Sequence, residues 1–197
     1  MNRPYAESCD QNRDPILTVI QPLLQQCQNV LEIGSGTGQH AIYFGAQMPH
    51  LRWHTSDRLE YHPGILAWLT EAALPNVLPP IELDVQQSRW PTRAIDVIFS
   101  ANTTHIMHGS DVEALFAGAG KLLPSGGLLL LYGPFSNAGQ HNSDSNLRFD
   151  QFLRARDPLS GIRDIDDLNR LATQAGLTFC HDYEMPVNNR ILHWQKV

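Results

Sequence analysis

The residues Val30-Leu-Glu-Ile-Gly34-Ser-Gly36-Thr-Gly38-Gln39-His40 carry the strongest structural signal of the chain. A short apolar run ends here in three glycines at alternate positions, and apolar residues at helical spacing follow. Gly34 allows a sharp turn, Gly36 lets a ligand approach the backbone, and Gly38 opens a helix close to a sheet. The stretch therefore predicts a strand, a tight ligand-binding loop and a helix.

The glycine spacing disfavours two common phosphate-binding loops. The dinucleotide fingerprint G-x-G-x-x-G needs a glycine at position 39, which is Gln39 in this chain. A P-loop needs Gly-Lys-Ser/Thr, and no such triplet follows the glycines. An NAD-dependent oxidoreductase is therefore a weak alternative.

Outward from the loop, short β-rich runs alternate with helical patterns, which predicts an α/β fold with a mostly parallel sheet and helices on both faces. The first helix is expected to begin at Pro15 with Asp14 as its N-cap, and to be kinked or ended by Pro22. A capping box at Ser110 and Glu113 marks another helix start. The predicted strands are 30–33, 51–57, 81–85, 94–101 and 128–132, and the helices between them cover 38–48, 63–73 and 110–123.

Beyond Gly133 the pattern changes. A polar loop over 134–144 precedes helical patterns around 147–153 and over 164–175. The strand-like runs Leu177–Glu184 and Arg190–Lys196 are joined by a connection too short for a parallel crossover. They predict an antiparallel C-terminal hairpin at the sheet edge.

The composition limits the classes of protein to which this chain can belong. With 197 residues, 42% hydrophobic residues, 17% charged residues and a net charge of −6, the chain is expected to form a single domain over 1–197. The acidic balance and the absence of a Lys/Arg cluster argue against a nucleic-acid partner. No apolar run could span a bilayer and Met1–Asp10 lacks a signal-peptide core, which predicts a cytoplasmic protein without a membrane partner. Three scattered cysteines predict neither disulfides nor a zinc site.

The glycine loop, together with acidic residues at later strand ends, resembles motif I and its partners in class I S-adenosylmethionine-dependent methyltransferases. The resemblance implies that Asp57 binds the ribose hydroxyls, that Asp84 and Val85 hold adenine, and that Glu32 braces the loop near the methionine ammonium. A single acidic residue at a strand end is also a common helix cap or turn residue. The implied cofactor-binding set is Glu32, Gly34, Ser35, Gly36, Gly38, Asp57, Asp84, Val85 and Asn102.

A wider resemblance covers nearly the whole chain. The motifs at 8–17, 101–106, 131–135 and 184–189 are similar to those of a small bacterial family of unknown function related to methyltransferase-like protein 26. The resemblance implies a Rossmann-like class I fold with seven strands in the order 3-2-1-4-5-7-6, and S-adenosylmethionine as cofactor. It implies no particular substrate.

Methyl transfer from a sulfonium is an in-line displacement, which needs alignment, and a base only where the nucleophile arrives protonated. We expect a small-molecule acceptor, because only an N-terminal lid over 1–15 and an insertion over 134–160 remain outside the core. The predicted catalytic residues are His105, Asn102 and Tyr132, and the substrate-side candidates are Asn12, Arg13, Thr104 and His141.

His105 is the best candidate base, because a neutral imidazole is available near pH 7. A packing or capping histidine is an equal alternative for this residue. His105 and His108 have no third ligand of comparable placement, so no metal is expected. A non-catalytic domain that binds S-adenosylmethionine or a protein partner is the main alternative function.

Overall fold

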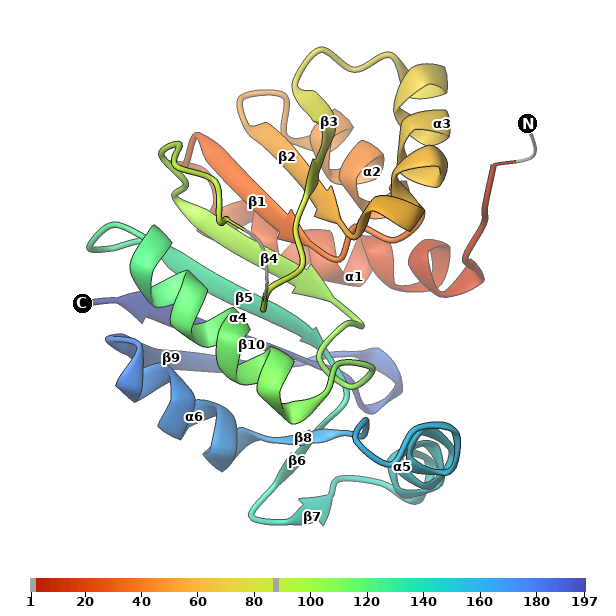
Figure 1. Ribbon diagram of the computed structural model, residues 1–197, viewed down its shortest axis with the longest axis vertical. Coiled ribbons are helices and arrows are strands. Elements are labelled where there is room, and N and C mark those ends of the chain that lie inside the picture. The colour runs from red at the N-terminus through yellow and green to blue at the C-terminus, as the bar shows by residue number, and fades with distance from the viewer. Residues whose placement is uncertain (1–2, 87–88) are drawn as a thin grey trace.

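The central feature of the computed structural model, which describes residues 3–86 and 89–197, is a seven-stranded sheet in the order β3-β2-β1-β4-β5-β10-β9 (Figure 1). The first five strands in the chain are parallel, and β10 runs antiparallel to both β5 and β9. The predicted order and terminal hairpin are confirmed. The strands are β1 (Asn29–Ile33), β2 (Arg52–Asp57), β3 (Val77–Glu82), β4 (Val97–Ala101), β5 (Leu128–Gly133), β9 (Leu177–Glu184) and β10 (Arg190–Lys196).

Helices cover both faces of this sheet because successive side chains of the central strands point to opposite sides. Val30 faces a core that includes residues of α1 and α2, whereas Leu31 faces a core that includes residues of α4 and α6. Figure 1 shows α4 and α6 in front of the sheet and α1 behind it. The covering helices are α1 (Glu7–Leu23), α2 (Gln39–Gln47), α3 (His62–Ala72), α4 (Gly109–Leu122) and α6 (Ile165–Gln174).

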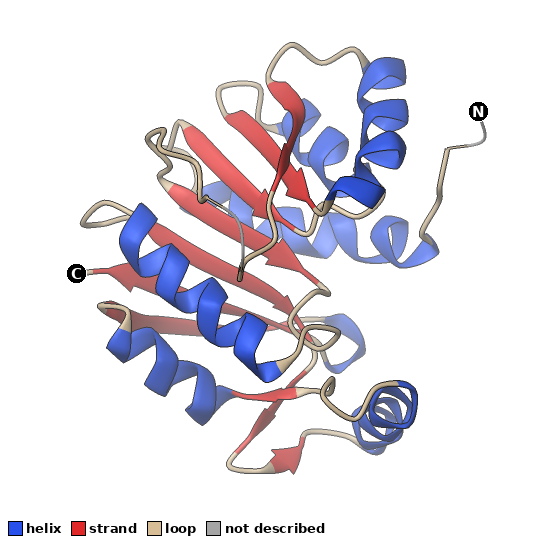
Figure 2. Ribbon diagram, viewed as in Figure 1, coloured by secondary structure: helices blue, strands red, loops and turns tan. Residues whose placement is uncertain are grey.

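A smaller substructure lies beyond the carboxyl end of β5 (Figure 2). β6 (Phe135–Asn137), β7 (Gln140–His141) and β8 (Arg163–Asp164) form a three-stranded sheet, and α5 (Asp144–Arg156) stands beside it. The predicted polar loop over 134–144 is therefore wrong in part. Its strands arise because Phe135 pairs with Arg163, a contact between distant parts of the sequence. Two 3-10 turns, η1 (Leu59–Tyr61) and η2 (Pro186–Asn188), complete the fold.

The first helix begins earlier than predicted. α1 starts at Glu7 and contains Pro15, so Asp14 is not its N-cap. Asn12, Ile16 and Ile20 share one buried stripe at four-residue spacing, and this packing against the core outweighs the backbone hydrogen bond lost at Pro15. The helix ends just after Pro22, as the sequence predicts.

Three further boundaries differ from the predictions. β3 includes Pro79 and Pro80, which an edge strand tolerates because one side of its backbone needs no partner, so the predicted 81–85 is shifted. β4 begins at Val97 and not at residue 94. The cap of α4 is His108 with Asp111, whose Oδ2 accepts the His108 N–H at 3.0 Å, and not Ser110 with Glu113.

Within the described ranges, no helix combines the length and apolar character needed to cross a membrane.

Candidate functional site

The glycine loop connects β1 to α2 and has the backbone that the sequence predicts. Gly34, Gly36 and Gly38 all have left-handed φ values, of 72°, 57° and 90°. A Cβ on Gly38 would lie 3.3 Å from the Ile65 Cα, whereas a Cβ on Gly36 would meet no atom within 4 Å. The loop is therefore packed against α3 at Gly38 and open at Gly36, where a ligand can approach the backbone.

The buried carboxyl group of Glu32, near the end of β1, holds this loop through a hydrogen bond to Ser35. Glu32 Oε2 accepts hydrogen bonds from Ser35 Oγ at 2.9 Å and from Trp53 Nε1 at 3.1 Å, and the residue is only 2% exposed. Burial raises the pKa of Glu32 to about 7, against the lowering effect of those two hydrogen bonds. Ser35 N–H also donates to the Ser56 carbonyl at 2.9 Å, which ties the loop to β2.

Asp57 lies at the end of β2 and faces the open part of the loop. Its Oδ2 accepts the Gly36 N–H and its Oδ1 accepts the Arg58 N–H, both at 2.8 Å. Burial raises the pKa of Asp57, and these two N–H groups oppose the shift. A carboxylate has about four acceptor sites, so two backbone donors leave sites for the hydroxyls of a ligand.

The segment after β3 joins the same edge of the sheet. Leu83 N–H donates to the Asp57 carbonyl at 3.0 Å, which places Asp84 next to the end of β2. Because β3 ends at Glu82, Asp84 and Val85 follow the strand and do not close it, which corrects the predicted strand end.

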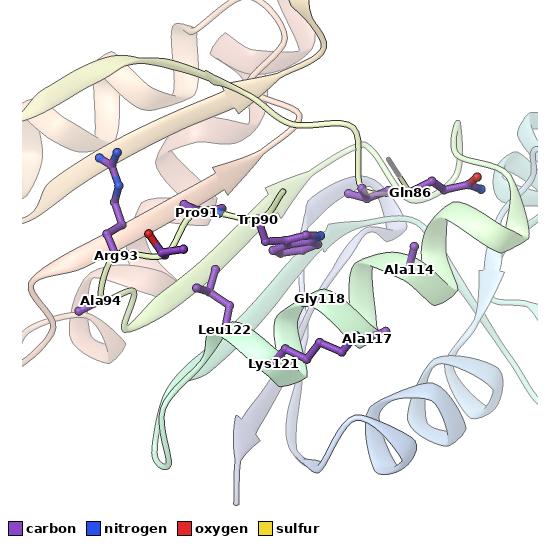
Figure 3. Close-up of a pocket in the computed structure, with 12 residues that line it drawn as sticks. Gln86, Trp90, Pro91, Arg93, Ala94, Ala114, Ala117, Gly118, Lys121 and Leu122 are labelled. Carbon is purple, nitrogen blue, oxygen red and sulfur yellow. The ribbon is translucent and has the colours of Figure 1, made fainter. Parts of the chain in front are cut away.

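Val85 and Gln86 line one end of a cavity of about 720 Å³ between this segment and α4 (Figure 3). Trp90 faces Gly118 in that cavity, and a Cβ on Gly118 would lie 2.1 Å from the indole. Neither the glycine loop nor the β4–α4 loop lines it. The cavity is therefore adjacent to Val85 of the predicted adenine position and is not lined by the predicted catalytic residues Asn102 and His105.

The β4–α4 loop lies beside the glycine loop and contains two of the predicted catalytic residues, Asn102 and His105. Asn102 has a left-handed φ of 57°, and its N–H donates to the Tyr132 carbonyl at 2.8 Å. The next residue, Thr103, packs so tightly on Gly34 that a Cβ there would lie 2.8 Å from its side chain. A Cβ on Gly133 would lie 3.7 Å from His105 Nδ1 and 3.8 Å from Asn102 Oδ1. Asn102 and His105 therefore converge beside Gly133.

His105 is a buried, neutral imidazole. It is 6% exposed, and its Nδ1 is buried without a hydrogen-bond partner. Burial, with the nearby charge of Arg163, lowers the pKa of His105 to about 4. The Phe149 ring of α5 meets the imidazole edge to face, with 5.3 Å between ring centroids. The Nδ1 atom of His105 therefore keeps an unused hydrogen-bonding site beside Gly133.

A second polar group centres on Tyr132. Burial raises the pKa of the Tyr132 hydroxyl, and the neighbouring side chains of Asn12 and Asn189 oppose this shift. His40 Nε2 lies 2.6 Å from Asn12 Oδ1, and burial lowers the pKa of His40 to about 4. The sequence interpretation gives no role to His40 or Asn189, because the pairing of residues on α1, α2 and the β9–β10 turn is visible only in three dimensions.

The other substrate-side candidates lie in different surroundings. Thr104 is 3% exposed, and its carbonyl accepts a hydrogen bond from Arg163 Nε at 3.1 Å. Arg13 pairs with Asp10 at 2.7 Å and lies over the Tyr43 ring. His141 Nε2 lies 3.7 Å from Asp150 Oδ2. Their contact with a substrate stays a prediction.

Metal-ligating side chains do not gather in the part of the chain that the structure describes, where no group of three or more His, Cys, Asp or Glu residues could hold an ion. His108 Nε2 instead lies 2.8 Å from Asp157 Oδ2. This histidine therefore caps α4 and contacts Asp157.

Comparison with solved structures identifies the fold. The apo form of the S-adenosylmethionine-dependent methyltransferase SibL matches with a TM-score of 0.81 and 19% identity, over 96% of this chain and 55% of that one. An O-methyltransferase family 2 protein from Planctomyces limnophilus, in complex with apigenin, matches with a TM-score of 0.83 and 16% identity, over 96% and 60%. PigF with SAH matches with a TM-score of 0.81 and 13% identity, over 95% and 56%.

This chain spans a little over half of the length of those proteins. The likeness shows the class I methyltransferase fold, in agreement with the sheet order. A family model matches residues 3–196, and the chain therefore belongs to the family described as "Protein of unknown function (DUF938)".

Proposed function

We propose that this protein transfers the methyl group of S-adenosylmethionine to a small-molecule acceptor. One observation carries the proposal. Gly36 has a left-handed φ, leaves open space beside its backbone, and donates its N–H to the Asp57 carboxylate, at the same carboxyl end of the parallel strands as Asn102 and His105. Carboxyl ends of strands in open α/β sheets are where ligands bind. The fold shared with S-adenosylmethionine-dependent methyltransferases supports this choice of cofactor.

The residues present fit such a cofactor. Asp57 would accept the ribose hydroxyls with the acceptor sites that Gly36 and Arg58 leave unused, and Asp84 and Val85 would hold adenine. Glu32 and Ser35 would brace the loop around the aminoacyl end. The bound cofactor supplies an electrophilic methyl group on a sulfonium.

The chain's own residues would align and deprotonate the acceptor. Asn102 and His105 converge beside Gly133, so an acceptor atom placed there is held between an amide and an imidazole. His105 is neutral at physiological pH and would take the acceptor proton on Nδ1 during in-line displacement. Tyr132, Asn12, Arg13, Thr104 and His141 are proposed to position the substrate. The relationship to methyltransferase-like protein 26 stays a prediction from sequence motifs.

Thermal unfolding with and without S-adenosylmethionine tests cofactor binding. We expect the cofactor to raise the melting temperature of the wild type and Asp57→Ala to abolish most of that shift. Asp167→Ala is the matched control, because Asp167 is an exposed residue of α6 paired with Arg170. A wild type that S-adenosylmethionine does not stabilise contradicts the proposal, and preferential binding of NADH would indicate an oxidoreductase.

Transfer of a labelled methyl group to components of a metabolite extract separates the enzyme from a non-catalytic binding domain. We expect labelled product with the wild type. His105→Ala should lower turnover and leave cofactor affinity unchanged, because His105 lies on the acceptor side. Equal turnover in this variant would show that His105 is a packing residue.

A further inference from the structure

We infer that the methyl acceptor is an uncharged molecule carrying a flat apolar ring next to its nucleophilic group. The inference rests on the proposed function and names the substrate class of that site. It concerns the acceptor mouth, which we define as Asn102, His105, Gly133 and Phe149. The side chains of Asn102 and His105 lie close to Gly133, and the Phe149 ring contacts His105.

The polar groups of the acceptor mouth are neutral. Asn102 contributes an amide oxygen, and His105 contributes an unpaired ring nitrogen. An N–H buried without an acceptor is costly, so the favoured tautomer of His105 carries its proton on Nε2 and presents a lone pair at Nδ1. Both groups therefore accept a hydrogen bond from a ligand, and neither can neutralise a ligand charge.

Arg163, the cation whose charge acts on His105, already has hydrogen-bond acceptors within the protein. Arg163 donates through Nε to the Thr104 carbonyl at 3.1 Å, and through Nη2 to the carbonyls of Met107 and Leu159. These bonds fix the guanidinium to the backbone of the loops around the mouth. A ligand carboxylate would have to break them before it could pair with Arg163.

Two further charged groups near the mouth are also paired. Asp150 on α5, the residue after Phe149, accepts from Arg154 Nε at 2.8 Å and from the Ile162 N–H at 2.7 Å. Arg190 stands opposite Gly133 in the sheet register and donates to Asp182 at 2.5 Å. A charged substrate would meet no counter-ion among these groups, and an unpaired charge in a partly buried site is strongly disfavoured.

The remaining surface offered to a substrate is aromatic. Phe149 contacts the buried His105, yet 37% of its surface is exposed. One part of the ring therefore packs against His105, and another part faces solvent. Aromatic rings attract one another in offset and edge-on arrangements. A flat ring bound against Phe149 would carry its nucleophile toward His105 and Asn102, whereas an aliphatic polyol would leave Phe149 without a partner.

Three catechols with the same ring and hydroxyl groups test this inference: neutral 4-methylcatechol, anionic 3,4-dihydroxybenzoate and cationic dopamine. Their affinities for the full chain saturated with S-adenosylhomocysteine are measured by calorimetry. We expect the neutral compound to bind at least tenfold more tightly than either charged one. Equal or tighter binding of a charged compound, or no binding of the neutral one, overturns the inference. Failure of S-adenosylhomocysteine itself to bind would instead contradict the proposed function.

A charge placed at Phe149 gives an independent test. Phe149→Arg should weaken binding of 4-methylcatechol at least tenfold and strengthen binding of 3,4-dihydroxybenzoate, because it adds an uncommitted cation beside His105. Phe152→Arg is the matched control, since Phe152 is a more exposed phenylalanine of the same helix whose ring packs under Arg156. The inference is wrong if both variants change the two affinities equally.

Discussion

Gly36 is the residue at which stability and ligand binding are most clearly separable. Its φ of 57° disfavours any side chain, and a Cβ there would point into open space beside Asp57. Gly36→Ala should therefore cost only about 1 kcal/mol in folding, the strain of a left-handed alanine. The same methyl group should remove most of the thermal shift that S-adenosylmethionine produces, because it occupies the ligand's approach to the backbone.

Gly126→Ala is the control for this substitution. Gly126 has a φ of 83° and no atom within 4 Å of a Cβ, so the strain is similar, but it lies in the turn before β5. We expect this variant to lose comparable stability and keep the full cofactor shift. Equal cofactor shifts in both variants would mean that Gly36 does not face the ligand.

Glu32 gives a residue-scale prediction about pH. Its pKa is raised to about 7 by burial, so between the unfolded value near 4.5 and about pH 7 the folded state binds more protons than the unfolded state. Its stabilising contribution is therefore complete below pH 4.5 and is lost as pH rises toward 7. Glu32→Gln should remove this contribution, worth at most about 3 kcal/mol, when urea unfolding of variant and wild type is compared across that range. A constant difference at all pH values would contradict the raised pKa.

Among the elements, the turn between β9 and β10 holds the clearest backbone strain. Val187 is 80% exposed and has a φ of 58°, which a β-branched side chain strongly disfavours. Val187→Gly should stabilise the protein by about 1 kcal/mol and raise its melting temperature by about 3 °C. Val187→Ala should help less, because alanine keeps part of the strain. A lower melting temperature for the glycine variant would show that this turn is not strained in solution.

Some helices and strands could be predicted from the sequence, and others could not. The hairpin follows from the short connection between its strands, whereas the order of the strands in the sheet is predicted only by the family resemblance. The starts of α1 and β3 could not be predicted from the sequence, because prolines usually mark the ends of helices and strands. Pro15 is accepted within α1 because the helix packs against the core, and Pro79 is accepted within β3 because β3 is an edge strand. Likewise the glycine loop is predictable from one motif, whereas the contact of Asn189 with Tyr132 depends on the folded turn.

At the scale of the whole molecule, three separate buried histidines make the fold sensitive to acid. His40 on α2, His54 on β2 and His105 after β4 each have a pKa lowered to about 4, with burial as the main cause. Below pH 6.5 the unfolded chain binds protons that the folded chain excludes, so the free energy of unfolding falls as pH drops toward 4. Each histidine should contribute a loss of at most about 2 kcal/mol between pH 7 and pH 5.

Glu32 acts in the opposite direction over part of this range, since its raised pKa favours the folded state as pH falls. The three histidines outweigh Glu32 between pH 7 and pH 5, so urea unfolding should give a lower free energy of unfolding at pH 5 than at pH 7. His40→Gln should reduce this pH dependence, because a neutral amide keeps a donor for Asn12 without taking up a proton. Equal or greater stability at pH 5 in the wild type would mean that the pKa values of these histidines are not lowered in the folded state.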